Sequence, residues 1–287
     1  MKIFNHLSIL ISRKPIKMIE NDIDLSIVIK ILQSKKKISI DTEFTWRNTY
    51  FPILSLLQIS TNEFIYIIDP SSINNLEALN DIFLDKDIKK VFHSARSDIS
   101  VLNINLNSKF ENIFDTQVAD SIIYNSQNQI SYKDLVSKYF FVNLPKEQTN
   151  SNWNRRPLSK NQISYASNDV KYLHKISDIQ ERKLIKYRLM NKFKKSCNEE
   201  IAISQTKIID ARLLRYEKKN KGLSSLEKDL FIWRESEAEK LNIPPNYIFK
   251  DKYFRKLKKI ILENSFRDCD WIFKEEAYKQ SFFDRFR

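Results

Sequence analysis

The chain has 287 residues, of which 42% are hydrophobic and 30% charged, so a sizeable folded core is expected, and its net charge of +13 suggests a polyanionic partner. Its one glycine, Gly222, excludes a dinucleotide-binding fingerprint and a P-loop, and therefore a nucleotide cofactor. Two distant cysteines and three histidines provide no zinc motif, so a metal site would be built from carboxylates, which favour Mg²⁺ or Mn²⁺.

A codon bias toward lysine, asparagine and isoleucine is an alternative explanation of the positive charge.

The composition also bears on the N-terminal residues and on the cellular compartment. No segment approaches the roughly 18 apolar residues of a membrane span, so no membrane partner is expected. Residues 1–17 are basic, and their apolar stretch is too short for a signal-peptide core. We expect an N-terminal extension there, with a targeting peptide or a translation start at Met18 as alternatives, and a cytoplasmic protein.

The first half of the chain alternates strand and helix patterns. Three β-rich runs in quick succession indicate an antiparallel meander, at 38–44, 53–59 and 64–68. A helix is predicted at 74–83, a buried strand at 90–93 and a helix from about Ser97. After Asp115 the chain is mostly helical to about Cys197. This order predicts an α/β fold, with helices packed on a mixed sheet.

The second half predicts a separate, smaller helical domain. A basic helix is expected from Arg182 to Lys195, leading out of the first domain. Helical patterns follow at 226–241 and 253–264, interrupted by Pro244-Pro245. The boundary is placed near residue 200, which gives an extension at 1–17 and domains at 18–200 and 206–287. Both domains carry excess positive charge, so a polyanion could contact both.

Four elements carry candidate chemistry. Asp41 and Glu43 have i, i+2 spacing on a strand and so share one face, where two carboxylates repel unless a cation lies between them. A polar strand end facing water is the alternative. Asp98 begins a helix after a buried strand, where a lone aspartate is more often a cap or a solvated residue. Tyr165 and Asp169 are four apart on a helix and therefore neighbours. Asp115 is expected only to cap the next helix.

Taken together, these elements resemble the DEDD exonuclease superfamily in its tyrosine branch, which implies an RNase H-like fold. The histidine branch would place a histidine five residues before the last aspartate, where this chain has Ser164. Within the tyrosine branch the ribonuclease D family is similar over roughly 18–200. The likeness rests on the segments Asp41 to Phe44, Thr49 to Pro52, Leu57-Gln58, His93 to Asp98, Phe114 to Gln117, Trp153 to Leu158 and Tyr165 to Leu173.

The C-terminal part resembles the HRDC domain that follows the nuclease domain in that family, a helical module that contacts nucleic acid. The likeness lies in Trp233 to Glu235, Ala238, Asn242 to Ile248 and Asp251, and it fades after about Asn264. Family members often carry two such modules, whereas one is visible here. Whether residues 266–287 complete that module stays open.

The resemblance implies stepwise hydrolysis of RNA from the 3′ end, with tRNA precursors as the expected substrates and two divalent ions, Mg²⁺ or Mn²⁺, as cofactors. Two ions can stabilise the attacking and the leaving oxygen of a phosphodiester. The resemblance also implies that Asp41, Glu43 and Asp169 are ligands of the ion that activates water, and that Asp98 lies beside the second ion. Tyr165 would orient the water, because a hydroxyl with a reference pKa of about 10 is a poor base.

Several further residues are candidates for substrate binding. His93 could touch the scissile phosphate or terminal sugar, against the alternative of a satisfied strand-end histidine. Trp153 could stack on a base or anchor its loop. Arg155 and Arg156 could hold the RNA backbone or lie on solvated surface. A DNA 3′→5′ exonuclease and a non-catalytic RNA-binding module remain alternative functions. The non-catalytic module would require a decayed active site, whereas all four acidic residues and Tyr165 are present.

Overall fold

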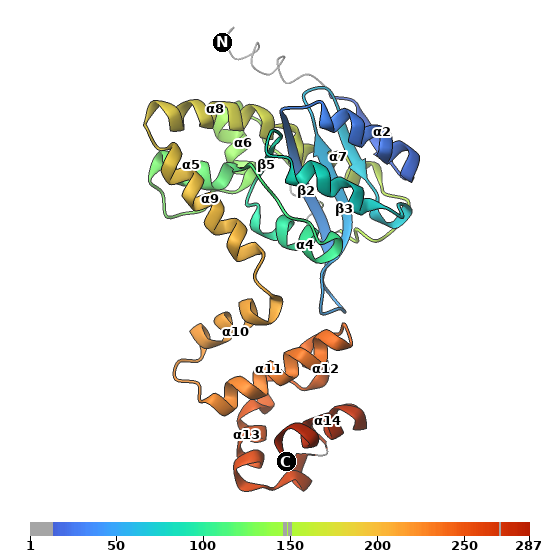
Figure 1. Cartoon of the computed structure of the whole chain (residues 1–287), viewed down its shortest axis with the longest axis vertical. Coiled ribbons are helices and arrows are strands. Elements are labelled where there is room, and N and C mark those ends of the chain that lie inside the picture. Colours follow the sequence, from blue (N-terminus) through green and yellow to red (C-terminus); the bar gives the residue numbers. More distant parts are fainter. Residues whose placement is uncertain (1–13, 146–147, 149–150, 270) are drawn as a thin grey trace. The chain divides into compact units, whose positions relative to one another are not determined.

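The computed structural model describes residues 14–145, 148, 151–269 and 271–287, so most of the expected N-terminal extension lies outside the described residues. Two compact units make up the chain. The first contains the residues up to 45 together with 53–205, and the second contains residues 46–52 and 206–287 (Figure 1). Among the described helices, none combines the length and apolar character of a membrane span.

The first unit is built on a six-stranded mixed sheet, which confirms the predicted fold class. Its strands are β1 (Ile16–Ile19), β2 (Lys37–Thr45), β3 (Ile53–Ser60), β4 (Ile65–Ile68), β5 (Lys89–Phe92) and β6 (Ile113–Asp115), in the spatial order β1-β4-β3-β2-β5-β6. β2, β3 and β4 pair antiparallel, as the predicted meander requires. β1 pairs parallel with β4, and β5 and β6 extend the other edge in parallel. β1 begins at Ile16, before the expected domain start at residue 18.

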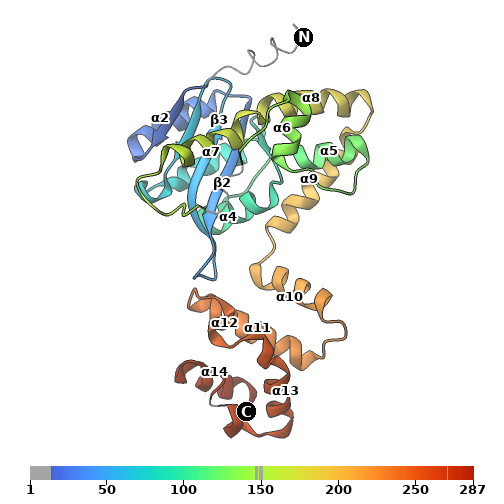
Figure 2. The same cartoon turned by 180° about the vertical axis from the view of Figure 1, so that it is seen from behind.

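Helices cover both faces of this sheet because apolar side chains alternate along its strands. On one face Ile40 and Leu57 join a core with α2 (Asp22–Gln33), α3 (Asn80–Leu84) and α4 (Arg96–Leu106). On the other face Leu56 and Val91 pack with α7 (Lys160–Lys171), α8 (Leu173–Lys186) and α9 (Met190–Ser204). The two opposite views show α4 and α7 on opposite sides of the sheet (Figures 1 and 2). The remaining helices are α5 (Thr116–Tyr124) and α6 (Tyr132–Phe140).

Two predicted helices have different bounds in the structure. The predicted helix at 74–83 is a 3₁₀ turn, Leu76–Leu79, followed by α3. The basic helix predicted from 182 to 195 is wrong, because α8 ends and α9 begins within it. Arg188 adopts a left-handed conformation (φ 57), its N–H donates to Ile185 O, and the N–H of Leu189 donates to Leu184 O. This is a Schellman ending with an arginine where glycine is usual.

The second unit is all helical. It contains α10 (Ile208–Lys219), α11 (Ser225–Lys240), α12 (Pro245–Ile248), α13 (Phe254–Glu263) and α14 (Glu276–Phe286), with 3₁₀ turns at Asp251–Tyr253 and Phe266–Cys269. α11 starts with a capping box between Ser224 and Glu227. Trp233, Leu257 and Phe282 lie in its aromatic-rich core. This helical architecture is consistent with the HRDC-like domain that the sequence predicts.

The segment between β2 and β3 belongs to the helical unit. Tyr50 is fully buried in that unit's core. Asn242, just after α11, accepts hydrogen bonds from the backbone N–H groups of Tyr50 and Phe51 at 3.1 and 3.0 Å. The Arg212 guanidinium lies 4.6 Å from the centre of the Tyr50 ring. The loop that follows the Asp-x-Glu strand is therefore part of the core of the helical unit.

Candidate active site

Strand β2 presents Asp41 and Glu43 on one face of the sheet. In the antiparallel register with β3, Asp41 lies opposite Gln58 and Glu43 opposite Leu56. The register shifts immediately after Glu43, where a β-bulge interrupts the pairing. Leu56 belongs to the core beneath α7, so the two carboxylates face the same helix. The alternative of a strand end facing water is wrong, because neither carboxylate is exposed.

Helix α7 brings the third carboxylate to this face. It begins with a capping box, in which the Ser159 hydroxyl accepts the Gln162 N–H and the Gln162 side chain accepts the Ser159 N–H. Ala166 and Val170 are fully buried against the sheet. Asp169, on the adjoining face of the helix, meets Asp41 and Glu43, and one oxygen from each of the three carboxylates lies within 4.8 Å of the others.

Asp98 lies beside this three-carboxylate cluster in the first turn of α4. It is only 7% exposed, and the N-cap position of α4 is taken by Ala95. Its Oδ1 accepts hydrogen bonds from the Thr42 backbone N–H at 3.1 Å and from the Thr42 hydroxyl at 2.6 Å. The cap and solvated-residue alternatives for Asp98 are therefore wrong. Thr42 had no assigned role, although strand alternation between Asp41 and Glu43 already points it to the opposite face.

The pKa values of all four carboxyl groups are raised above their usual range. Burial is the largest cause for each, and it raises the pKa of Glu43 to about 9 and those of Asp98 and Asp169 to about 7. The pKa of Asp41 is raised well above its usual value, because its own burial is reinforced by the charges of all three neighbours. Carboxylates that destabilise one another in this way form a site suited to a divalent cation.

A buried amide beside the cluster also fits a site that is completed by a ligand or water. Gln58, opposite Asp41 on the same face, is fully buried. Neither of its side-chain polar atoms has a hydrogen-bond partner among the described residues. Buried amides are normally satisfied, so this position fits a metal-bound water or another polar group next to the carboxylates.

Asp115 caps α5, as predicted, and also supports the start of α4. Its carboxylate accepts hydrogen bonds from the N–H groups of Gln117 and Val118. It further accepts the N–H groups of Ser94 at 3.1 Å and Ala95 at 2.7 Å. Asp115 thereby fixes the turn between β5 and α4 that leads to Asp98, a role the sequence did not reveal.

His93 ends β5 in a largely buried position. The Thr116 hydroxyl donates to Phe92 O, so it accepts from His93 Nδ1 at 2.9 Å. Burial lowers the pKa of His93 to about 4, which leaves the ring neutral at neutral pH. Its ring also lies against Tyr132 at 5.5 Å between centroids. Nδ1 is thus satisfied by the fold, whereas the buried Nε2 has no hydrogen-bond partner among the described residues, and contact of His93 with substrate stays a prediction.

The segment before α7 holds two residues that we expected to bind substrate. Trp153 is 2% exposed and packs against Tyr165, with ring centroids 5.9 Å apart. Arg156 forms a bidentate ion pair with Asp69, which is 1% exposed, and donates to Ser55 O at 2.8 Å. Both side chains therefore have partners within the fold, and their contact with RNA stays a prediction. Arg155 is exposed, and its role stays a prediction.

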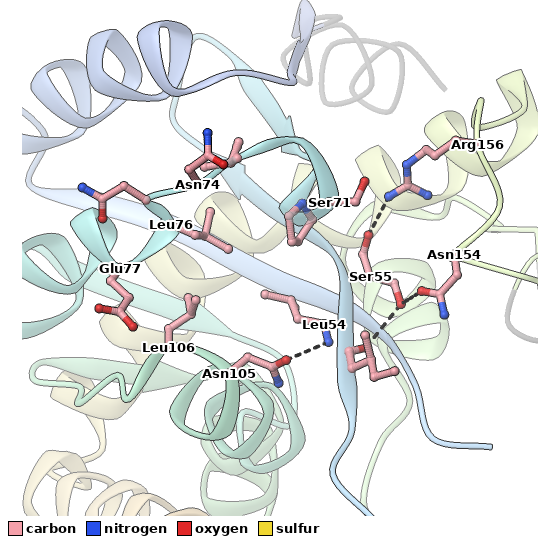
Figure 3. Close-up of a pocket in the computed structure, with 14 residues that line it drawn as sticks. Leu54, Ser55, Ser71, Asn74, Leu76, Glu77, Asn105, Leu106, Asn154 and Arg156 are labelled. Atoms are coloured by element: carbon pink, nitrogen blue, oxygen red, sulfur yellow. Dashed lines mark hydrogen bonds between the residues drawn. The ribbon is translucent and has the colours of Figure 1, made fainter. Parts of the chain in front are cut away.

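A surface pocket of about 660 Å³ adjoins this segment (Figure 3). Its polar side chains bond to one another and to the backbone. The Asn105 side-chain oxygen accepts the Leu54 N–H at 3.2 Å, and the Asn154 side-chain oxygen accepts the Ser55 hydroxyl at 2.6 Å. The four carboxylates do not line this pocket. We therefore place the candidate active site at the carboxylate cluster and not in this pocket.

Known proteins resemble this chain in sequence. A family model described as a 3′-5′ exonuclease matches residues 16–185. Ribonuclease D of Desulfotalea psychrophila is 34% identical over 241 residues, which cover 79% of this chain and 62% of the relative. Ribonuclease D of Bartonella henselae is 34% identical over 245 residues, covering 82% and 59%. The chain thus spans about three fifths of the length of these curated relatives.

Solved structures show the same fold. Escherichia coli RNase D superposes with a TM-score of 0.82 at 21% identity, covering 95% of this chain and 73% of the other. The catalytic core of RRP6 from Trypanosoma brucei superposes with a TM-score of 0.68 at 22% identity, covering 95% and 80%. Because the family model covers more than half of the chain and contains the carboxylate cluster, the chain belongs to the 3′-5′ exonuclease family, with similarity to ribonuclease D.

Proposed function

We propose that the chain is a metal-dependent 3′→5′ exoribonuclease that releases nucleoside 5′-monophosphates stepwise from RNA. The convergence of Asp41, Glu43 and Asp169 within 4.8 Å, with Asp98 beside them, carries this proposal. The names of the curated relatives support RNA as the substrate. Escherichia coli RNase D is an exoribonuclease involved in structured RNA processing, so we extend the proposal to structured RNA 3′ ends and to tRNA precursors in particular.

The carboxylates divide between two ion sites in this proposal. Asp41, Glu43 and Asp169 would hold one divalent ion, and Asp41 and Asp98 would contribute to holding a second. Bound Mg²⁺ or Mn²⁺ supplies Lewis-acid stabilisation of the attacking and leaving oxygens. Tyr165, one turn before Asp169 on α7, orients the water through its hydroxyl.

We also propose a division of labour along the chain. Residues 18–200 form the exonuclease domain and residues 206–287 an HRDC-like domain that binds nucleic acid, while 1–17 form an extension. The family match at 16–185 and the helical unit at 206–287 support this division. The low cysteine content supports the cytoplasm as the compartment.

The test compares 3′-end trimming of one short single-stranded RNA and its DNA equivalent, with Mg²⁺ or Mn²⁺. The proteins are the wild type, Asp41→Asn and the control Asp81→Asn, which removes an exposed carboxylate on α3. We expect metal-dependent release of 5′-monophosphates from RNA by the wild type and the control, and none by Asp41→Asn. Preference for DNA would support a DNA exonuclease. Binding without trimming of either strand would leave a non-catalytic module.

A further inference from the structure

The helical unit displays an exposed tryptophan with a lysine over its ring. Trp271 is 59% exposed. The Lys256 ammonium lies 4.1 Å from the centre of its ring, and Tyr253 meets it edge-on with centroids 5.3 Å apart. Lys252 lies 4.9 Å from the centre of the Tyr253 ring. We call Lys252, Tyr253, Lys256 and Trp271 the Trp271 cluster.

The fold holds this indole at the surface. The next two residues, Ile272 and Phe273, are 5% and 8% exposed and belong to the unit's core. Ile272 N–H also donates to Cys269 O at 2.9 Å. The chain on the C-terminal side of Trp271 is therefore anchored while its side chain projects outward.

The segment that supplies Lys252, Tyr253 and Lys256 is strongly positive. Residues 250–259 contain six basic side chains and one acidic side chain. The acid, Asp251, accepts a hydrogen bond from the buried Arg234 at 2.6 Å and so is engaged by the fold. Lys258 and Lys259 pair with Glu227 and Glu263. No ion pair involving Lys256 is found among the described residues, and its ammonium lies over the indole.

From this combination we infer that the Trp271 cluster binds single-stranded RNA, with a base stacked on the Trp271 indole and the backbone phosphates beside Lys252 and Lys256. The Lys256 ammonium lies over the ring, and the indole is more than half exposed to solvent. Stacking needs a base released from a duplex, so the cluster selects unpaired strand over double helix. Positive charge near the ring then adds salt-dependent affinity for the phosphates.

This inference rests on the proposed function for its choice of RNA, and it deepens that proposal by locating a grip on the strand within the helical unit. Stacking on an indole does not read the 2′-hydroxyl, so a DNA strand of the same sequence should bind this cluster equally well. Discrimination between RNA and DNA would then lie elsewhere in the protein.

The test measures the affinity of the full chain for an unstructured RNA about 12 nucleotides long, a length typical of single-strand sites. Fluorescence anisotropy in EDTA, which prevents metal-dependent trimming, reports binding alone. We expect Trp271→Ala to weaken binding about tenfold and Trp271→Phe to retain most of it, because Phe keeps a ring. Lys256→Gln should reduce the slope of log affinity against log salt by about 0.7, the value for one phosphate on a single strand.

Leu262→Ala is the matched control, because Leu262 is 68% exposed on α13 and has no aromatic face. It should bind like the wild type, and a duplex RNA should bind the wild type and Trp271→Ala alike. Equal losses in Trp271→Ala and Leu262→Ala, or wild-type affinity in Trp271→Ala and Lys256→Gln, would overturn the inference. If no protein, the wild type included, trims RNA while the differences in binding persist, the exonuclease proposal is rejected and the inference about the Trp271 cluster is retained.

Discussion

The carboxylate of Asp98 is held by Thr42, which donates both its backbone N–H and its hydroxyl to the same oxygen. Thr42 stands between Asp41 and Glu43 on β2 and points to the opposite face of the sheet. One short strand therefore supplies two carboxylates on the α7 side and holds a third that comes from α4. This explains how carboxylates from opposite faces of the sheet come together at β2.

Replacing Thr42 with valine should disturb Asp98 without changing the volume of the side chain. The Thr42 hydroxyl bond lowers the pKa of Asp98, so its loss should raise that pKa above its present value of about 7. A hydrogen bond to a charged group contributes about 2 kcal/mol, which corresponds to a shift of about 1.5 pKa units. The acidic limb of the pH–kcat profile for RNA trimming should move to higher pH. Thr42→Ser keeps the hydroxyl and should follow the wild type, and coincident profiles for valine and wild type would contradict this role.

The metal-free protein should lose stability as the pH rises. The folded-state pKa values of Asp98 and Asp169, about 7, and of Glu43, about 9, exceed the unfolded values near 4. Their contribution to stability is therefore complete below about pH 4 and is lost as the pH rises through the folded pKa values. In EDTA, the melting temperature of the wild type should fall more steeply between pH 6 and pH 9 than that of Glu43→Gln, by linkage. Glu77→Gln, an exposed control, should match the wild type.

Divalent ions should reverse this loss at alkaline pH. An ion that binds only the folded state at about 100 times its Kd adds about 2.7 kcal/mol of stability. Titration of Mn²⁺ or Mg²⁺ at pH 8 should therefore raise the melting temperature of the wild type and of Asp81→Asn, by mass action. Asp169→Asn removes one of the three converging carboxylates and should respond weakly. A response equal to that of the wild type would place the ion elsewhere.

Arg156 should matter for stability and not for affinity toward RNA. Arg156→Ala leaves Asp69 buried without its partner, which costs about 3 kcal/mol for a pair of this kind. Urea unfolding should show this loss, while the KM for trimming by the folded protein should stay within about twofold of the wild type. Arg155→Ala, next to it and exposed, should leave unfolding unchanged. A raised KM with unaltered stability in Arg156→Ala would restore Arg156 to the substrate site.

Two residue pairs of the candidate active site could be predicted from sequence because their placement depends on fixed local spacings. The i, i+2 pair on β2 and the Tyr165–Asp169 pair on α7 lie where their periodicities place them. The burial of Trp153 and the ion pair of Arg156 could not be predicted, because they depend on neighbours far away in sequence. The Arg156 partner, Asp69, lies 87 residues earlier.

The turns were harder to predict because the chain has one glycine. Left-handed positions that are usually marked by glycine are occupied by other residues. They include Arg188 between α8 and α9 and a set of asparagines, Asn107, Asn112, Asn125, Asn242 and Asn264. Asparagine tolerates this conformation better than other residues, so asparagine after an apolar-periodic run is the usable signal in this sequence. At Arg188 no such signal exists, and the predicted basic helix ran through the turn.

The assignment of residues 46–52 to the helical unit means that the two units are joined by three stretches of backbone, at residues 45–46, 52–53 and 205–206. A protein shortened at residue 205 would expose Tyr50 and Phe51 to water and lose the Asn242 acceptor of their backbone N–H groups. Protease cleavage between 205 and 206 should instead leave two fragments that elute together, because Tyr50 stays inserted in the aromatic core. Recombination that exchanges the helical unit between homologous genes would therefore also have to exchange the hairpin loop behind Glu43.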